Sequence, residues 1–594
     1  MARPLILGNS RLHVGINSKG EWVDIYYPYV GYPNHGHRMS LGLFDGKKMK
    51  WMKDYKVKLS YLEEGPIALI ENEDVKVISF VHYLKPILWN RVINPKNLTL
   101  FFYHDLHIKE NPFKDTAMLD KKLKAIIHYK DDVYFAFSTI PSFEQFAVGI
   151  KEWGGLEGTW RDAEDGLLSG NMVSHGLVDS CLGLKSKLVD HFMVVANSFK
   201  DLKGNLIYAK EEGFNKSLEE TKAYWSSWLS SLNSLVNKKL LNLKLLNLLK
   251  RSLTVIKLLM SENGALVAST DFEIIRFGGD NYNYVWPRDA SYCAEALDSW
   301  GYYDDASKIF DFLFPLISEK GYFLHKYYPT GNFGSTWHPV PFIQIDQTGS
   351  FLYFFWKHYH LSKKIDQVAK NWDKIVKMGK FLEEFRDRNT GLPKASWDLW
   401  EERKTINTYS SCAVYGGLLA CSRLAEIMGR RDLRDQFLKA SEEVREGIIK
   451  YLYDERLKRF IKALGDERVD SSLFSIFYFE VLPPKDPRVI NTMLEVESKL
   501  SVGGGIARYE GDGYFKVSEG IPGNPWILTT LYLSIFYSEI GNFERAKSLI
   551  EVVSNFDLLP EQFNPITKEN VSVLPLAWSH AAFALALKKF LSNL

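Results

Sequence analysis

The stretch HFMVVANSFKDLKGNLIYAKEEGFNKSLEETKAYWSSWLSSLNSL, residues 191–235, contains the point at which the chain changes its periodicity. Up to Ser198 the apolar residues come in short runs rich in Val, Phe and Met, whereas after it charged and apolar residues recur at helical spacing. The stretch therefore predicts a β region that ends near residue 204, followed by linker helices over 205–238.

The region before this point predicts many antiparallel strands. Segments such as KVKLSYLEEGPIALI, VKVISFVHYL, LTLFFYHDLHI and VYFAFSTI are rich in Val, Ile, Tyr and Phe, and Gly, Asp, Asn and Pro separate them. We expect residues 1–204 to form a large β-sandwich domain.

The region after the linker predicts helices throughout. Apolar residues at the 3.6-residue period and cap signals indicate segments near 239–262, 288–300, 303–316, 344–361, 366–387, 409–428, 431–453, 470–480, 486–500, 524–540, 542–555 and 575–594. Gly301, Gly429 and Gly541 each end one helix just before the next begins, which predicts antiparallel helix hairpins. Because these glycines lie 128 and 112 residues apart, we expect a closed helical toroid over 239–594 instead of a short-repeat solenoid.

The connections between these helices are long, notably 263–287, 317–343, 388–408, 501–523 and 556–574. Long loops inside a compact domain commonly carry function, and these are rich in Trp, Arg, Asp and Glu. We therefore looked for chemistry in the loops.

Composition excludes several classes of protein. The 594 residues carry 74 Lys and Arg against 72 Asp and Glu, so a formal net charge of +2 disfavours a nucleic-acid or anionic-membrane partner. Hydrophobic residues at 46% and charged residues at 25% are globular values. The four cysteines form no CxxC pair, and His338 has no companion at metal spacing, so we expect no metal and no cofactor. Without a secretory or membrane-spanning pattern, a cytoplasmic location is predicted.

Three loop motifs contain residues suited to sugar chemistry. In SWDLWEER, residues 396–403, Glu401 and Glu402 stand beside Trp397 and Trp400, where partial desolvation can raise the pKa of a carboxyl group toward that of a general acid. Glu561 stands in a proline-bounded loop before the last helix. A solvated acidic pair and core tryptophans remain the plainer reading of the first motif.

The third motif is NYNYVWPRD, in which Tyr282, Tyr284, Trp286, Arg288 and Asp289 stand at the start of a predicted helix. An adjacent Arg and Asp can donate to and accept from neighbouring sugar hydroxyls, with aromatic faces alongside. The plainer alternative is an N-terminal cap with a surface arginine.

Taken together, the three motifs resemble glycoside hydrolase family 15, the family of glucoamylases. Its W-x-R-D, LWEE and E-Q-F motifs occur here in the family's order, as WPRD, LWEE and Glu561-Gln562-Phe563, and GIARYEGDGY followed by GNPW is similar to a further family stretch. The resemblance implies an (α/α)6 barrel preceded by a super-β-sandwich. It also implies Glu401 as general acid, Glu561 as general base, and substrate contacts from Tyr282, Trp286, Arg288, Asp289, Trp400, Glu402, Arg508 and Trp526.

The resemblance predicts an inverting exo-acting glucoamylase that releases glucose from α-glucans or maltooligosaccharides. An α,α-trehalase, an α-1,6-acting glucodextranase and a noncatalytic carbohydrate-binding protein stay open as alternatives, as does a homo-oligomer. An inverting pair predicts that the carboxyl groups of Glu401 and Glu561 lie about 6.5 to 9.5 Å apart.

Overall fold

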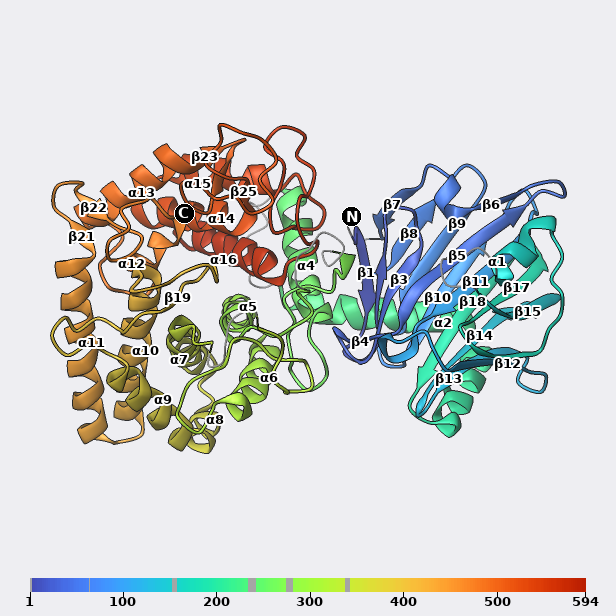
Figure 1. Cartoon of the computed structure of the whole chain (residues 1–594), viewed down its shortest axis with the longest axis horizontal. Coiled ribbons are helices and arrows are strands. Elements are labelled where there is room, and N and C mark those ends of the chain that lie inside the picture. The colour runs from blue at the N-terminus through green and yellow to red at the C-terminus, as the bar shows by residue number, and fades with distance from the viewer. Residues whose placement is uncertain are drawn as a thin grey trace. The chain divides into compact units, whose positions relative to one another are not determined.

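The chain forms two compact units, Met1–Ser234 with Leu258–Glu262 and Thr270–Asn283, and Leu235–Lys257 with Asn263–Ser269 and Tyr284–Leu594. Our computed structural model describes residues 3–62, 65–151, 158–232, 242–273, 281–336 and 342–593. Figure 1 draws the strands of the first unit in blue to cyan and the helices of the second in green to red. His338 and residues 233–241, where the linker was predicted to end, lie outside the described residues. The division at residues 204 and 238 stays a prediction.

The first unit contains two large antiparallel sheets. The order is β1-β2-β3-β5-β11-β17-β15 in one, with β4 on β3 and β6 on β5, and β16-β12-β13-β14-β18-β10-β9-β8-β7 in the other. Their bounds are β1 Leu5–Gly8, β2 His13–Ile16, β3 Trp22–Tyr29, β4 Tyr32–Asn34, β5 Gly36–Phe44, β6 Met49–Trp51, β7 Lys58–Tyr61, β8 Ala68–Glu71, β9 Lys76–Val81, β10 Ile87–Ile93, β11 Thr99–Leu106, β12 Asp115–Asp120, β13 Ala125–Lys130, β14 Val133–Ile140, β15 Gln145–Ile150, β16 Val173–Gly176, β17 Val178–Lys185 and β18 Leu188–Ala196.

A common apolar core joins the two sheets. Val14, Leu41 and Phe102 contribute from one sheet, and Phe135 and Met193 from the other, all within one cluster of buried side chains. Alternate residues of each strand face this core, which is the packing of a β-sandwich. The predicted sandwich is confirmed.

Three fully buried histidines form a polar network inside the sandwich. His104 Nε2 lies 2.9 Å from His191 Nε2, and the Ser180 hydroxyl contacts His104 Nδ1 at 3.1 Å and His128 Nε2 at 2.8 Å. Burial lowers the pKa of His128 and of His191 to about 3, and burial with the neighbouring histidines lowers the pKa of His104 well below its ordinary value. The three imidazoles are therefore neutral at neutral pH.

Helix α2, Phe199–Ser230, covers one face of the second sheet. It begins six residues before the predicted linker, at the Ser198 cap whose side chain accepts from the Asp201 amide. Leu206 and Phe214 pack in one cluster with Trp89 of the sheet, and the helix bends at Gly213, where φ is 71°. The segment predicted as a linker is thus part of the sandwich's packing.

The second unit contains a closed ring of inner helices. Helix α5 contacts α7, α7 contacts α10, α10 contacts α12 and the preceding 3-10 turn, this turn contacts α14, α14 contacts α16, and α16 contacts α5. These are Pro287–Ser299, Ile345–Ser362, Thr408–Ile427, Ser475–Tyr478 with Ser471–Phe474, Ile527–Ile540 and Ala577–Asn593. A helix buried on all sides is apolar all round, as ILTTLYLSIF of α14 shows.

The second layer of the barrel consists of amphipathic helices. On α11 the side chains of Leu433, Phe437, Val444 and Ile448 are buried, at the spacing of one helical face. The remaining helices are α4 Leu243–Leu258, α6 Tyr303–Leu313, α8 Ile365–Lys370, α9 Trp372–Glu384, α11 Arg431–Tyr451, α13 Pro487–Leu500 and α15 Phe543–Val553. The predicted (α/α)6 barrel is confirmed, and no helix of the described ranges is long and apolar enough to cross a membrane.

The predicted helices agree with those observed, with two exceptions. The segment 366–387 is broken into α8 and α9, and 470–480 is a 3-10 turn followed by a single helical turn. The three junction glycines have φ values of 83°, 70° and 87°, so their predicted left-handed conformation is confirmed.

Glycine also sets the spacing of two inner helices. A Cβ atom at Gly349 of α7 would lie 2.3 Å from the carbonyl oxygen of Ala413 on α10, and one at Gly417 would lie 2.8 Å from the Cα atom of Gly349. The two backbones can approach this closely only because these positions carry no side chain.

Candidate active site

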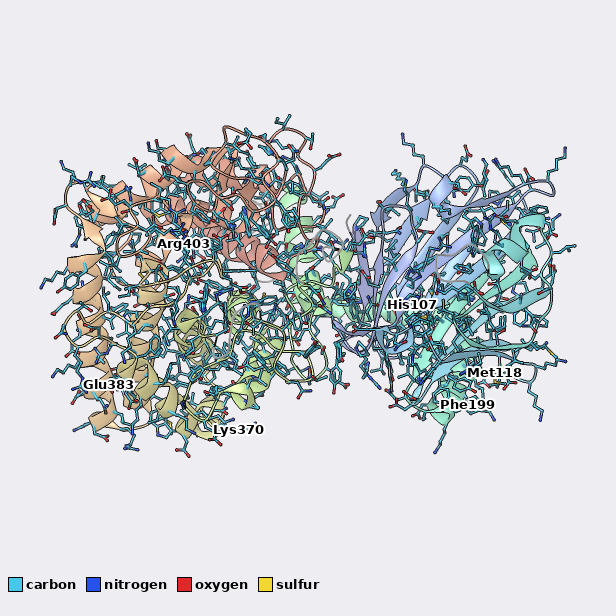
Figure 2. All side chains as sticks on the ribbon, in the orientation of Figure 1. His107, Met118, Phe199, Lys370, Glu383 and Arg403 are labelled. Carbon is cyan, nitrogen blue, oxygen red and sulfur yellow. The ribbon has the colours of Figure 1, made fainter. Side chains whose placement is uncertain are left out.

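Glu401 lies in a tight hairpin before α10. Strands β19, Ser396–Trp397, and β20, Lys404–Thr405, pair around the LWEE sequence, and the Glu401 amide donates to the Asp398 carbonyl at 3.0 Å. Arg403, labelled in Figure 2, ends this turn. Glu401 adopts φ of 63°, a left-handed conformation that is uncommon for a residue with a side chain.

Two ring nitrogens hold the Glu401 carboxylate. Trp286 Nε1 donates to Oε1 at 2.7 Å, and His325 Nε2 lies 2.9 Å from Oε2. His325 is fully buried, and its ring packs against Phe342 at 4.1 Å. Because each carboxylate oxygen has its own partner, the orientation of the carboxyl group is fixed before substrate binds.

The charges around Glu401 lower its pKa. Burial alone would raise the pKa, but the imidazolium of His325 and the cations of Lys326 and Arg288 lower it to about 2. The expectation that the flanking tryptophans raise it is therefore wrong for Glu401. Trp397 stacks on Phe342 at 5.1 Å, and Trp400 donates to Asp470 at 3.0 Å, so neither ring supplies the dominant influence on this carboxylate.

Glu402 belongs to a second cluster, built around Arg508. Arg508 Nη2 donates to Glu402 Oε1 at 2.9 Å, and the Tyr509 hydroxyl donates to Glu402 Oε2. Asp512 accepts from Arg508 at 2.6 and 2.7 Å, which leaves the guanidinium held on two sides.

Aromatic rings surround the same guanidinium. The Arg508 Cζ atom lies 5.2 Å from the ring centroid of Trp400 and 4.7 Å from that of Trp526. The two indoles are 5.9 Å apart. The structure thus brings together four of the predicted substrate-contact residues: Trp400, Glu402, Arg508 and Trp526.

Arg288 and Asp289 lie in the first turn of α5, after Trp286 at the N-cap and Pro287 at the first helical position. Arg288 donates to Asp289 at 3.1 Å and to the fully buried Asp346 at 3.2 Å. Burial and the nearby Glu401 charge raise the pKa of Asp289 to about 6, although Arg288 opposes the shift. The pair is a buried charged group, not a surface cap.

Glu561 lies in the loop between α15 and α16. Its carboxylate accepts from the Ser572 hydroxyl, and its carbonyl oxygen accepts from the Ile527 amide at 3.1 Å. Gln562 forms an antiparallel bridge with Trp526. Glu561 is therefore adjacent to the start of α14, next to the cluster around Arg508.

One end of the barrel thus collects residues from all five long loops. Trp286 and His325 contact Glu401, and a second series of contacts runs from Glu402 through Arg508 and Trp526 to Gln562. The separation of the Glu401 and Glu561 carboxyl groups stays a prediction. Tyr282 is counted with the β-sandwich unit, and its role likewise stays a prediction.

Sequence reasoning missed several partners of these residues, among them His325, Asp346, Asp512 and Ser572. His325 occurs in the aromatic stretch YFLHKYY, and Asp512 occurs in RYEGD, part of the stretch that resembles the family. The local sequence could therefore have pointed to both residues. Asp346 and Ser572 carry no local signal, because only the fold brings them to Arg288 and Glu561.

The model of Glycosyl hydrolases family 15 matches this chain over residues 244–332 and 326–556, which is more than half of its length. The chain belongs to glycoside hydrolase family 15. This family 15 member is a glycoside hydrolase, and its sequence is 28% identical to an uncharacterized glycosyl hydrolase of Methanocaldococcus jannaschii, over 98% of this chain and 97% of that protein.

Two further comparisons concern relatives with named activities. Trehalase 2 of Sulfolobus acidocaldarius is 25% identical over 58% of this chain and 63% of that protein, and a glucoamylase of a Clostridium species is 22% identical over 82% and 73%. The crystal structure of a bacterial glucoamylase complexed with acarbose matches 100% of this family 15 chain and 94% of that chain, with a TM-score of 0.85 at 17% identity. At that identity the match shows the fold, which includes both the sandwich and the barrel.

Proposed function

We propose that the chain is an inverting, exo-acting glucoamylase that releases β-D-glucose from the nonreducing ends of α-glucans or maltooligosaccharides. The observation that supports this most is the cradle of Glu401, in which Trp286 and His325 each contact one carboxylate oxygen. A carboxyl group fixed in this way can meet the oxygen of a scissile bond in one orientation.

In the proposed reaction Glu401 donates a proton to the glycosidic oxygen as the bond to the anomeric carbon breaks. A water molecule attacks that carbon from the opposite face, and Glu561 accepts its proton. The configuration at the anomeric carbon is inverted, because the leaving group and the water lie on opposite sides of the sugar ring.

The remaining residues hold the terminal glucose in this proposal. Arg288 and Asp289 offer a donor and an acceptor to ring hydroxyls, and Glu402 and Arg508 do the same from the second cluster. Indole faces provide apolar surface for the sugar ring. The proposed substrate-contact set is Tyr282, Trp286, Arg288, Asp289, Trp400, Glu402, Arg508 and Trp526.

Burial raises the pKa of Glu401, but His325, whose Nε2 lies 2.9 Å from Oε2, is the strongest of the groups that lower it. We propose that His325 positions Glu401 toward the glycosidic oxygen.

A trehalase activity is the second candidate. It is favoured by the similarity to trehalases, such as Trehalase 2 of Sulfolobus acidocaldarius. The same acid and base would cleave an α,α-1,1 bond, so the difference depends on which leaving group fits beyond the terminal glucose.

Measuring glucose release from maltose, isomaltose and trehalose separates these candidates. We expect the highest kcat/KM on maltose and longer α-1,4 oligosaccharides, whereas a preference for trehalose would reassign the chain as a trehalase. The first glucose that NMR detects from the nonreducing end of a maltooligosaccharide should be the β-anomer. Initial release of the α-anomer would rule out inversion and with it the role of Glu561.

Two variants test the acid and the base. Glu401→Gln should impair maltose hydrolysis far more than hydrolysis of α-glucosyl fluoride, because fluoride departs without a proton donor. Glu561→Gln should impair both by about 10² to 10⁴-fold, since both reactions need an activated water. Glu384→Gln on the exposed end of α9 is the matched control and should change neither. Equal loss on both substrates for Glu401→Gln would contradict its role as acid.

A further inference from the structure

The β-sandwich carries a cluster of metal-binding side chains that the glycosidase reaction does not use. His37 lies on β5, Asp105 on β11, and His107 directly after β11, and one ligand atom of each lies within 4.8 Å of the others. Figure 2 labels His107 on the sandwich. Within the ranges that the structure describes, this is the one group of three such residues.

A β-bulge brings His37 to the other two residues. The pairing of β5 and β11 shifts between Asp105, opposite Arg38, and Leu106, opposite Gly36, so His37 has no opposing residue. In an unbroken pair His37 would face the same side as Leu106, which is buried in the core. The extra residue instead allows His37 to reach Asp105 and His107.

Gly36 makes this bulge sterically possible. A Cβ atom at Gly36 would lie 2.4 Å from the Val23 carbonyl oxygen of the neighbouring strand. Only glycine fits at that distance. The bulge that brings His37 to Asp105 and His107 therefore depends on Gly36.

The side chains present the donor set of a transition metal. His37 Nδ1 lies 2.8 Å from Asp105 Oδ2, His107 Nε2 lies 3.8 Å from Asp105 Oδ1, and the two imidazole rings stack at 4.1 Å. Two imidazoles and a carboxylate suit Zn²⁺, Co²⁺, Ni²⁺ or Cu²⁺, whereas Mg²⁺ and Ca²⁺ prefer oxygen ligands.

A lysine ammonium already occupies the position of a cation in this cluster. Lys151 Nζ donates to Asp105 Oδ1 and lies 3.3 Å from His107 Nε2. The same two side chains therefore attract positive charge, and an entering metal ion must displace the ammonium.

A cavity of about 220 Å³ gives the cluster access to solvent. Its lining includes both histidines together with Asp24, Glu110 and Glu273, and Arg3 is the one arginine or lysine among its lining residues. The excess of carboxylates favours entry of a divalent cation.

We propose that His37, Asp105 and His107 bind one divalent transition-metal ion, such as Zn²⁺, in exchange for the Lys151 ammonium. The site lies in the sandwich and is independent of the proposed glycosidase activity.

The test uses the full chain after chelator treatment and gel filtration. Titration with Co²⁺, followed by its visible absorption bands, should saturate at one ion per chain, and Zn²⁺ should displace the Co²⁺. His37→Ala and His107→Ala should each abolish that binding, whereas His175→Ala, a histidine of the same unit outside the cluster, should leave it unchanged.

Lys151→Met provides an independent measurement, because removal of the competing ammonium should tighten Co²⁺ binding. Circular dichroism and maltose hydrolysis check that each variant folds. Absence of saturable binding to both the parent chain and Lys151→Met would overturn the proposal, as would one-to-one binding that survives both His37→Ala and His107→Ala.

Discussion

Acidification from pH 7 to pH 5 should weaken the β-sandwich through its buried histidines. His128 and His191 have pKa values lowered to about 3 in the folded chain, and His104 is shifted in the same direction, whereas an unfolded histidine titrates near pH 6.5. The stability that these neutral imidazoles contribute is therefore complete above pH 6.5 and is lost as the pH falls toward 3.

The magnitude follows from the protons that only the unfolded state binds. Each pH unit below 6.5 costs about 1.4 kcal/mol per histidine, so at pH 5 His128 and His191 each cost about 2 kcal/mol and together about 4 kcal/mol, and His104 acts in the same direction. Asp115 and Asp179, whose pKa burial raises to about 6, act in the opposite direction and offset about 1 kcal/mol each. The net loss of about 2 kcal/mol, to which His104 adds, is a substantial fraction of the stability of a domain.

Hydrogen exchange of the peptide that contains β18 measures this loss in the sandwich itself. The free energy of opening, corrected for intrinsic exchange rates, should fall between pH 6.5 and 5. His128→Gln should reduce the slope by about 1.4 kcal/mol per pH unit, whatever its effect on stability at pH 7. An opening free energy that stays constant from pH 6.5 to 5, or an unchanged slope in His128→Gln, would refute the reasoning.

Three further predictions concern the barrel. Asp289→Asn should lower kcat/KM on maltose by about 10- to 150-fold, because the terminal glucose loses a charge-assisted hydrogen bond of about 1.5–3 kcal/mol; wild-type kcat/KM with an intact circular dichroism spectrum would remove Asp289 from the site. His325→Gln should raise the pKa of Glu401 and so move the alkaline limb of kcat/KM on maltose to higher pH, because His325 is the strongest of the groups that lower this pKa; an unmoved limb would show that His325 does not set the pKa of Glu401. Gly349→Ala should destabilise the barrel by about 1–3 kcal/mol or more, because its Cβ would lie 2.3 Å from the Ala413 oxygen. Thermal unfolding measures this loss, with Gly513→Ala as the control because a Cβ there meets nothing within 4 Å. Equal melting temperatures of the two variants would contradict the close approach of α7 and α10.

Features encoded in local periodicity could be predicted from the sequence. The change at Ser198, the helical segments and the left-handed glycines at 301, 429 and 541 all follow from spacing over a few residues. The motif residues Trp400, Glu402, Arg508 and Trp526 lie in one cluster because the closed barrel brings its loops to one end.

The environment of Glu401 could not be predicted in this way. Besides burial, its pKa depends on His325, which precedes it by 76 residues, and on Lys326 and Arg288, which are also distant in sequence. The two tryptophans are neighbours of Glu401 in sequence, but Trp397 stacks on Phe342 and Trp400 donates to Asp470. Neighbouring tryptophans in the sequence indicate that a carboxylate is desolvated. Whether its pKa is finally raised or lowered depends on charged groups that only the tertiary structure brings near it.

The position of α2 determines how much of the chain an isolated N-terminal fragment must contain. A fragment that stops at residue 204 would expose Phe80, Trp89 and Phe192, which the helix covers through Leu206 and Phe214. An uncovered apolar sheet face promotes association between molecules. We therefore expect a fragment that ends after Ser230 to stay monomeric at concentrations where one that ends at residue 204 precipitates. The yield of soluble fragment then reports whether α2 packs on the sheet.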